Sequence, residues 1–149
     1  GTNAATLISL AFILHFGGIM PVLLVFLPCT LLAATAGVWV FYVQHQFENT
    51  YWEADKNWQL HQAALHGSSH YVMPRVLRWF SGNIGIHHVH HLYSRIPFYR
   101  LPEVLRDHAP LREINRLTIK ESFANARLHL WDENSKSLLS FSDAELLKD

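Results

Sequence analysis

The chain has 149 residues, with twelve basic and twelve acidic side chains, and half of its residues are hydrophobic. This length suits one domain, and the balanced charge gives no basic excess of the kind that binds nucleic acid, so we expect no nucleic-acid partner. Cys29 is the single cysteine, which excludes a disulfide framework and a thiolate metal site. A metal ion, if bound, must therefore be held by His, Asp or Glu side chains.

The charged residues divide the chain into two parts. No Asp, Glu, Lys or Arg precedes Glu48. Residues 4–43 are uncharged and almost wholly apolar, which is too long for one membrane span and suits two, because about 20 residues cross a bilayer core. A buried hairpin in a soluble protein is the alternative, but a soluble helix of this length normally shows a polar stripe and none is found here.

Two helical spans are predicted within the apolar part, over residues 4–16 and 20–44. Gly17 and Gly18 predict the reversal between them, and Pro28 is expected to kink the second span because proline removes a backbone hydrogen bond. A two-span hairpin returns the chain to the side from which it came. Since all Lys and Arg residues follow the second span, we expect the rest of the chain on the cytoplasmic side.

Several short helices are predicted after the second span. Residues 48–65 are expected to be helical, and residues 73–80 to form a short amphipathic piece on the membrane surface. Residues 102–108 place a proline in the first turn of another short helix. Apolar residues at helical spacing predict a further helix over residues 111–126.

These segments predict the fold class and the domain organisation. We expect an all-α membrane protein, since no alternating strand pattern is found. Residues 1–44 are predicted to form two transmembrane helices as a hairpin, and residues 45–149 a helical cytoplasmic region that carries the histidine cluster.

Four of the eleven histidines fall within five residues: His87, His88, His90 and His91. Residues three and four apart share a helix face, so His87 can act together with His90 and His91, although His88 and His91 are also three apart. His45 adds an imidazole at the expected end of the second span. A polar residue at a membrane boundary usually has a functional reason, and metal ligation is one such reason. Imidazole suits zinc, copper, nickel and iron, and spacing alone does not choose among them.

The remaining histidines are interpreted more plainly. His66 and His70 are four apart, but Gly67 and two serines between them make a poor helix, so we interpret the pair as surface polar residues. Four others are interpreted singly as packing or hydrogen-bonding residues: His15, His61, His108 and His129.

Two stretches of the sequence resemble acyl-lipid desaturases. The box His87-x-x-His90-His91, preceded by GNIGI and followed by LYSRIPFYRLPEVL, resembles the third histidine box of that family. The stretch FYVQHQFENTYW, residues 41–52, is similar to the segment that leaves the last span in bacterial members. The similarity extends through SFANARLHLWDENSKSLLSF near the end of the chain. Related hydroxylases and ketolases also carry HxxHH, so the two motifs together behind two apolar segments are what make the match specific.

The resemblance implies a di-iron centre, with two Fe ions held on the cytoplasmic side of four transmembrane helices by three histidine boxes and one further histidine. Carried over to this sequence, His87, His90 and His91 correspond to the third box and His45 to the further ligand. His88 lies at a variable position and is not counted as a ligand. No catalytic residue beyond the metal ligands is implied. The first two boxes are expected upstream of this sequence, which is therefore interpreted as a C-terminal fragment carrying the third and fourth spans.

The resemblance also implies the reaction: O2-dependent insertion of a cis double bond into a fatty acyl chain, of the omega-6 or delta-12 type. The hydrogens of unactivated methylenes are not acidic enough for a general base, so the chemistry belongs to the metal. The implied partners are a membrane lipid or acyl chain as substrate and a ferredoxin or cytochrome b5-type electron donor. Two alternatives stay open: a hydroxylase or ketolase of the same superfamily, and a non-catalytic membrane metal-binding protein.

Overall fold

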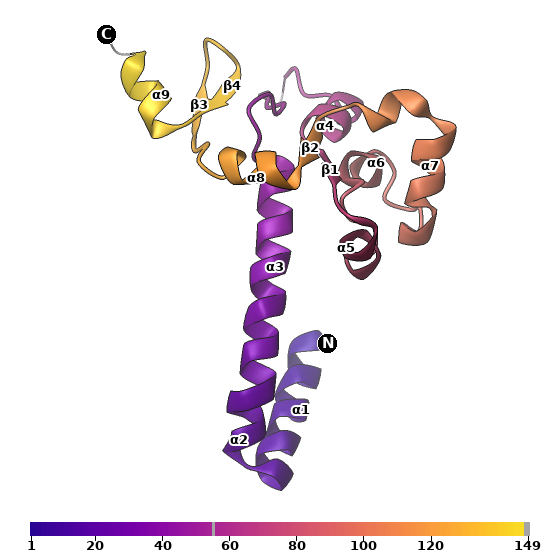
Figure 1. Ribbon diagram of the computed structural model, residues 1–149, viewed down its shortest axis with the longest axis vertical. Coiled ribbons are helices and arrows are strands. Elements are labelled where there is room, and N and C mark those ends of the chain that lie inside the picture. Colours follow the sequence, from indigo (N-terminus) through magenta and orange to yellow (C-terminus); the bar gives the residue numbers. More distant parts are fainter. Residues whose placement is uncertain (55, 148–149) are drawn as a thin grey trace. The chain divides into compact units, whose positions relative to one another are not determined.

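The computed structural model describes residues 1–54 and 56–147 (Figure 1). It contains two compact units, Gly1–Trp39 and Val40–Asp149. The described residues are mainly helical. The helices that begin in the first unit are α1 (Thr2–Gly17), α2 (Ile19–Pro21), the π-helical η1 (Val22–Phe26) and α3 (Leu27–His45), whose last residues belong to the second unit.

Within the first unit, the chain reverses its direction at Gly18. This residue separates α1 from α2 with φ 72° and ψ −166°, a conformation that residues with a side chain rarely adopt and glycine adopts readily. The predicted reversal at Gly17 and Gly18 is therefore confirmed. No residue of α1, α2 or η1 is buried, so the apolar side chains of these elements face outward.

One helix in the described residues is long and apolar enough to cross a membrane: Ile19–His45, with 27 residues and an 18-residue stretch whose mean hydropathy is 2.2. It comprises α2, η1 and α3. The helix α1 is apolar but has only 16 residues. The helix leaves α geometry at η1, where the Leu27 N–H bonds to the Val22 carbonyl five residues back. This wider turn comes just before Pro28, whose ring would otherwise press on the carbonyl four residues earlier.

The second unit is built from short elements around α6, the helix that carries the histidine box. Its helices are α4 (Leu60–His66), α5 (Arg75–Phe80), α6 (His87–Leu92), η2 (Phe98–Arg100), α7 (Leu101–Asp107), η3 (Ala109–Arg112), α8 (Ile119–Asn125) and α9 (Phe141–Leu146). Its strands are β1 (His70–Val72), β2 (Arg116–Thr118), β3 (Leu130–Asp132) and β4 (Ser137–Leu139). β1 and β2 pair in parallel, and β3 and β4 form an antiparallel hairpin.

Two of the predicted helices are wrong. Among the described residues of 48–65, which leave out position 55, only the part from Leu60 onward is helical, as α4. Residues 111–126 break into η3, β2 and α8. The break follows from tertiary pairing, because Leu117 is buried in β2 opposite β1. Thr118 then caps a new helix, accepting a hydrogen bond from the Glu121 N–H in a capping box.

Another local prediction is confirmed: the predicted helix over residues 102–108 corresponds to α7, which has Pro102 in its first turn. The piece predicted over residues 73–80 contains the short helix α5, whose Trp79 and Phe80 are 74% and 76% exposed. Its place on a membrane surface stays a prediction.

The core of the second unit lies between α6 and α7. Ile86 and Val89 pack there with Leu101 and Leu105 as one buried cluster. α6 also lies against α4 and β1. A buried hydrogen bond of 3.1 Å between the hydroxyls of Tyr71 and Ser122 ties β1 to α8. The histidine helix is therefore enclosed on several sides by elements from distant parts of the sequence.

Gly85 sets the close approach of β1 to the segment that enters α6. The Tyr71 N–H donates to the Gly85 carbonyl over 2.7 Å, and the neighbouring residues His70 and Ile86 form a bridge. A Cβ at Gly85 would collide with the Tyr71 carbonyl oxygen and come within 2.9 Å of Met73 Cε. Only glycine allows this contact without a shift of the backbone.

We therefore expect Gly85→Ala to destabilise the folded protein by about 1–3 kcal/mol, because overpacking displaces the backbone. The thermal unfolding midpoint of the detergent-solubilised protein measures this. Gly37→Ala in α3 is the matched control, since a Cβ there meets nothing within 4 Å. An unchanged midpoint for Gly85→Ala would contradict the close packing at this position.

Candidate metal centre

Three histidines from two elements bring their ring nitrogens together. His45 is the last residue of α3, and His87 and His91 lie four apart on one face of α6. His91 Nε2 lies 3.2 Å from His45 Nε2 and 3.0 Å from His87 Nε2. The three candidate ligand atoms all lie within 4.8 Å of one another.

Two of these three separations fit a bound metal ion. Two imidazole nitrogens held at about 2.0–2.1 Å from one ion, near a right angle, lie about 3 Å apart. The observed separations of 3.0 and 3.2 Å match that geometry. Imidazole ligands suit iron as well as zinc, copper and nickel. The donor set therefore admits iron and does not by itself select it.

A hydrogen bond to the backbone orients the ring of His45. His45 Nδ1 lies 2.8 Å from the Phe41 carbonyl oxygen. A carbonyl only accepts, so Nδ1 carries the hydrogen and Nε2 presents a lone pair toward the other two rings. Metal-binding histidines are commonly held in this way through their second ring nitrogen.

His90 does not share this cluster. Its ring centroid lies 5.8 Å from that of His87 and 6.0 Å from that of His91. The four residues expected to act together are thus placed as a group of three with His90 beside it. That each of the four binds a metal ion stays a prediction.

His88 and His70 hold the box helix in place. His88 is fully buried, and its Nε2 donates to the Leu111 carbonyl over 2.8 Å. His70 lies in β1, and its Nδ1 donates to the carbonyl of Arg112, the residue after Leu111, also over 2.8 Å. Their ring centroids are 5.6 Å apart. The interpretation of His70 as a surface polar residue is therefore incomplete, because the residue is half-buried and bonds the backbone of Arg112, 42 positions away.

Burial keeps these imidazoles neutral. Burial, reinforced by the neighbouring rings of His91, His45 and His90, lowers the pKa of His87 to about 3. Burial also lowers the pKa of His88 to about 4, although the hydrogen bond to the Leu111 carbonyl opposes it. The pKa values of His70 and His91 are likewise lowered by burial. Neutral imidazole is the form that binds metal, so burial prepares His87 and His91 to bind at physiological pH.

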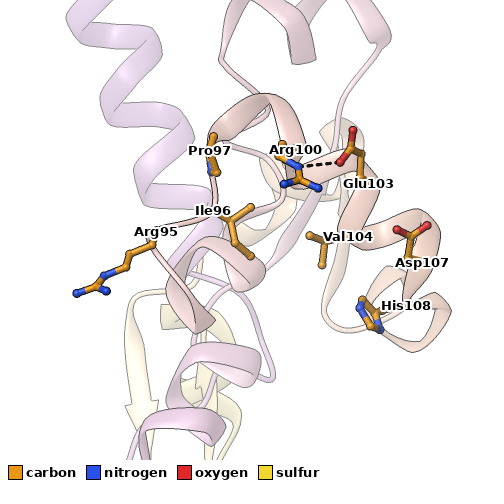
Figure 2. A pocket seen from close by; sticks show the side chains of 8 residues that line it. All are labelled: Arg95, Ile96, Pro97, Arg100, Glu103, Val104, Asp107 and His108. Carbon is orange, nitrogen blue, oxygen red and sulfur yellow. Dashed lines mark hydrogen bonds and ion pairs between the residues drawn. The ribbon is translucent and has the colours of Figure 1, made fainter.

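A charged hollow of about 370 Å³ lies away from this cluster, beside α7 (Figure 2). Arg100 and Glu103 form an ion pair at its rim with a separation of 2.9 Å. Asp107, His108 and Arg95 also line it. None of its lining residues belongs to the three-histidine group, so we assign it no part in metal binding.

The fold and the histidine geometry define a mainly helical protein in which an apolar helix of membrane-spanning length ends at a candidate metal centre. Residues 2–123 match the family described as fatty acid desaturase. A protein of Bacillus subtilis (strain 168) named fatty acid desaturase is 47% identical over 114 residues, which cover 76% of this chain and 32% of that protein. The chain belongs to the fatty acid desaturase family.

The chain spans about a third of the length of this bacterial relative. No solved structure is significantly similar to this chain. The family is membrane-associated, which agrees with the length and composition of Ile19–His45.

The depressed pKa of His88 predicts how the stability of the metal-free protein depends on pH. Because the folded-state pKa of about 4 lies below the ordinary value of 6.5, the unfolded state takes up the proton first as the pH falls. The contribution of His88 is therefore complete above pH 6.5 and is lost between about pH 6.5 and 4, at up to about 1.4 kcal/mol per pH unit. Chemical denaturation at several pH values measures this slope, and His88→Gln is expected to flatten it. An equal slope in that variant would contradict the buried neutral state of His88.

Proposed function

We propose that this chain is the C-terminal part of an O2-dependent acyl-lipid desaturase that introduces a cis double bond at a histidine-bound di-iron centre. Membership of the family supports the reaction class. The observation that carries the proposal is the convergence of His45, His87 and His91 at nitrogen separations of 3.0 and 3.2 Å. The proposed reaction is of the omega-6 or delta-12 type.

The residues of this chain hold and orient imidazole lone pairs. His45, His87 and His91 would hold one iron, and His90, which lies beside them, would contribute to a second. When bound, the iron pair supplies the oxidising power from O2 that removes hydrogen from unactivated methylenes. The backbone carbonyl of Phe41 fixes the His45 ring, and His88 anchors the opposite side of α6 through Leu111.

Four imidazoles are too few for two irons that must also accept O2. We therefore propose that further histidine boxes, on parts of the protein beyond these residues, complete the ligand set. The extent of the match supports this, since the aligned region is 32% of the bacterial relative.

We further propose that Ile19–His45 and α1 both cross the membrane and that the region after His45 is a cytoplasmic cap. The apolar composition of both segments supports this, as does the absence of Lys and Arg before the second unit. The exposed aromatic face of α5, beside Arg75 and Arg78, suits the lipid headgroup region. The proposed partners are a membrane lipid or acyl chain as substrate and a ferredoxin or cytochrome b5-type protein as electron donor.

Substituting His91 tests the site, because its Nε2 contacts both other nitrogens. His91→Ala in the full-length enzyme is expected to lower bound iron and abolish desaturation, measured by metal analysis and by acyl-chain profiling. His61→Ala is the control, since His61 is an exposed histidine outside the group. Full activity in His91→Ala would refute the ligand role. Hydroxylated or keto products from the unaltered enzyme would favour the related reactions instead.

Residues 1–149 alone are expected to bind metal weakly and to form no double bonds, because the ligand set is incomplete. Expression in a desaturase-deficient host that supplies electron donors, followed by lipid analysis, measures this. The full-length enzyme in the same host is the positive control. New unsaturated acyl chains from residues 1–149 would show that the proposed ligand count is wrong.

A further inference from the structure

His87 differs from the other two clustered histidines in the surroundings of its second ring nitrogen. His45 Nδ1 is hydrogen-bonded to the Phe41 carbonyl, and His91 is an exposed residue. His87 is only 7% exposed. Its Nδ1 is buried with no hydrogen-bond partner among the residues that the structure describes.

That buried nitrogen must carry a hydrogen if His87 is to bind metal. The Nε2 of His87 faces His91 at 3.0 Å and is the atom that joins the cluster. A neutral imidazole has one N–H and one lone pair, so a lone pair on Nε2 requires the hydrogen on Nδ1. A buried N–H without an acceptor is costly. The ring therefore needs an acceptor close to Nδ1.

Gln44 offers a buried acceptor atom that lacks a donor. Its side chain is fully buried at the end of α3, and Nε2 donates to the Ile84 carbonyl over 3.1 Å. Because a carbonyl only accepts, this bond fixes which end of the amide is the oxygen. The remaining atom, Oε1, is buried and has no partner among the described residues.

The hydrogen bond of the Gln44 amide places it beside the segment that enters α6. The carbonyl that it binds, that of Ile84, is three residues before His87. An unpartnered buried acceptor and an unpartnered buried donor thus belong to neighbouring parts of the second unit.

We propose that Gln44 is a positioning residue for His87: its Oε1 accepts a hydrogen bond from a water that in turn accepts the Nδ1–H of His87. This inference rests on the proposed function, because it assigns the outer hydrogen bond of one proposed ligand. The bond would fix both the tautomer and the ring orientation that aim Nε2 at the metal.

Two other buried unpartnered atoms of the second unit are complementary to each other. Ser69 Oγ and His88 Nδ1 are also buried without partners in the described part of the chain. Since His88 donates through Nε2, its Nδ1 is an acceptor that suits the Ser69 hydroxyl. Successive residues on a helix do not face each other, so His88 is a poor acceptor for His87.

The test compares metal release from matched variants of the full-length protein. Each protein is loaded anaerobically with Fe²⁺ and mixed with a chelator, and the release rate is followed. Gln44→Met keeps the side-chain volume but removes the acceptor, so release is expected to accelerate about 10–100-fold. Gln46→Met is the control, because Gln46 also donates its amide to a carbonyl, that of Leu128, at 2.8 Å. It is expected to release iron at the unaltered rate.

Three results would overturn the proposal. One is release from Gln44→Met at the unaltered rate, and another is equal acceleration in Gln46→Met, which would indicate general destabilisation. A third is Ser69→Ala releasing iron as fast as Gln44→Met, which would assign the acceptor to Ser69. Failure of the unaltered protein to retain iron would instead refute the proposed function, so the two failures are distinguishable.

A measurement on the unaltered sequence applies even where Gln44→Met does not fold. The metal-free full-length protein is labelled with ¹⁵N-histidine, and the His87 signal is assigned by its loss in His87→Gln. We expect the hydrogen on Nδ1 of His87, with a ¹⁵N chemical shift typical of a hydrogen-bonded N–H. A hydrogen on Nε2 would overturn the proposal.

Discussion

The site depends on backbone oxygens that accept a hydrogen bond from one ring nitrogen of a histidine and so decide which nitrogen keeps its lone pair. The Phe41 carbonyl does this for His45. The Leu111 carbonyl does it for His88, whose burial also disfavours the charged form. The backbone carbonyls therefore determine which ring nitrogen presents its lone pair. A cluster of histidines becomes a metal site only under this constraint.

The box helix could not impose that geometry alone. α6 has six residues, which is too short for an isolated helix to be stable in water. Its position comes from the apolar cluster shared with α7 and from the backbone approach of Tyr71 to Gly85. Packing energy far larger than any single hydrogen bond therefore stabilises the ring positions. The strand β1 also helps to hold the box helix, because it places the ring of His70 against that of His88.

The apolar helix and the chemistry meet at one residue. His45 closes Ile19–His45 and also supplies one of the three converging nitrogens. The proposed reaction on an acyl chain would suit a site at the boundary of the apolar region, because polar ligands are costly to place inside that region. The fatty acid desaturase family, to which the chain belongs, is membrane-associated, and this arrangement suits that setting.

The sequence by itself determined the long apolar helix, the reversal at Gly18, the helix that begins near Pro102 and the family. Each of these depends on composition or on spacing within a few residues, which the sequence displays directly. The tertiary structure decided the rest. It broke residues 111–126 at a strand that pairs with β1 and separated His90 from the other three histidines. It also brought His70 and Gln44 to the buried side of the site. Their partners lie about forty positions away, and contacts over that distance leave no local pattern to detect.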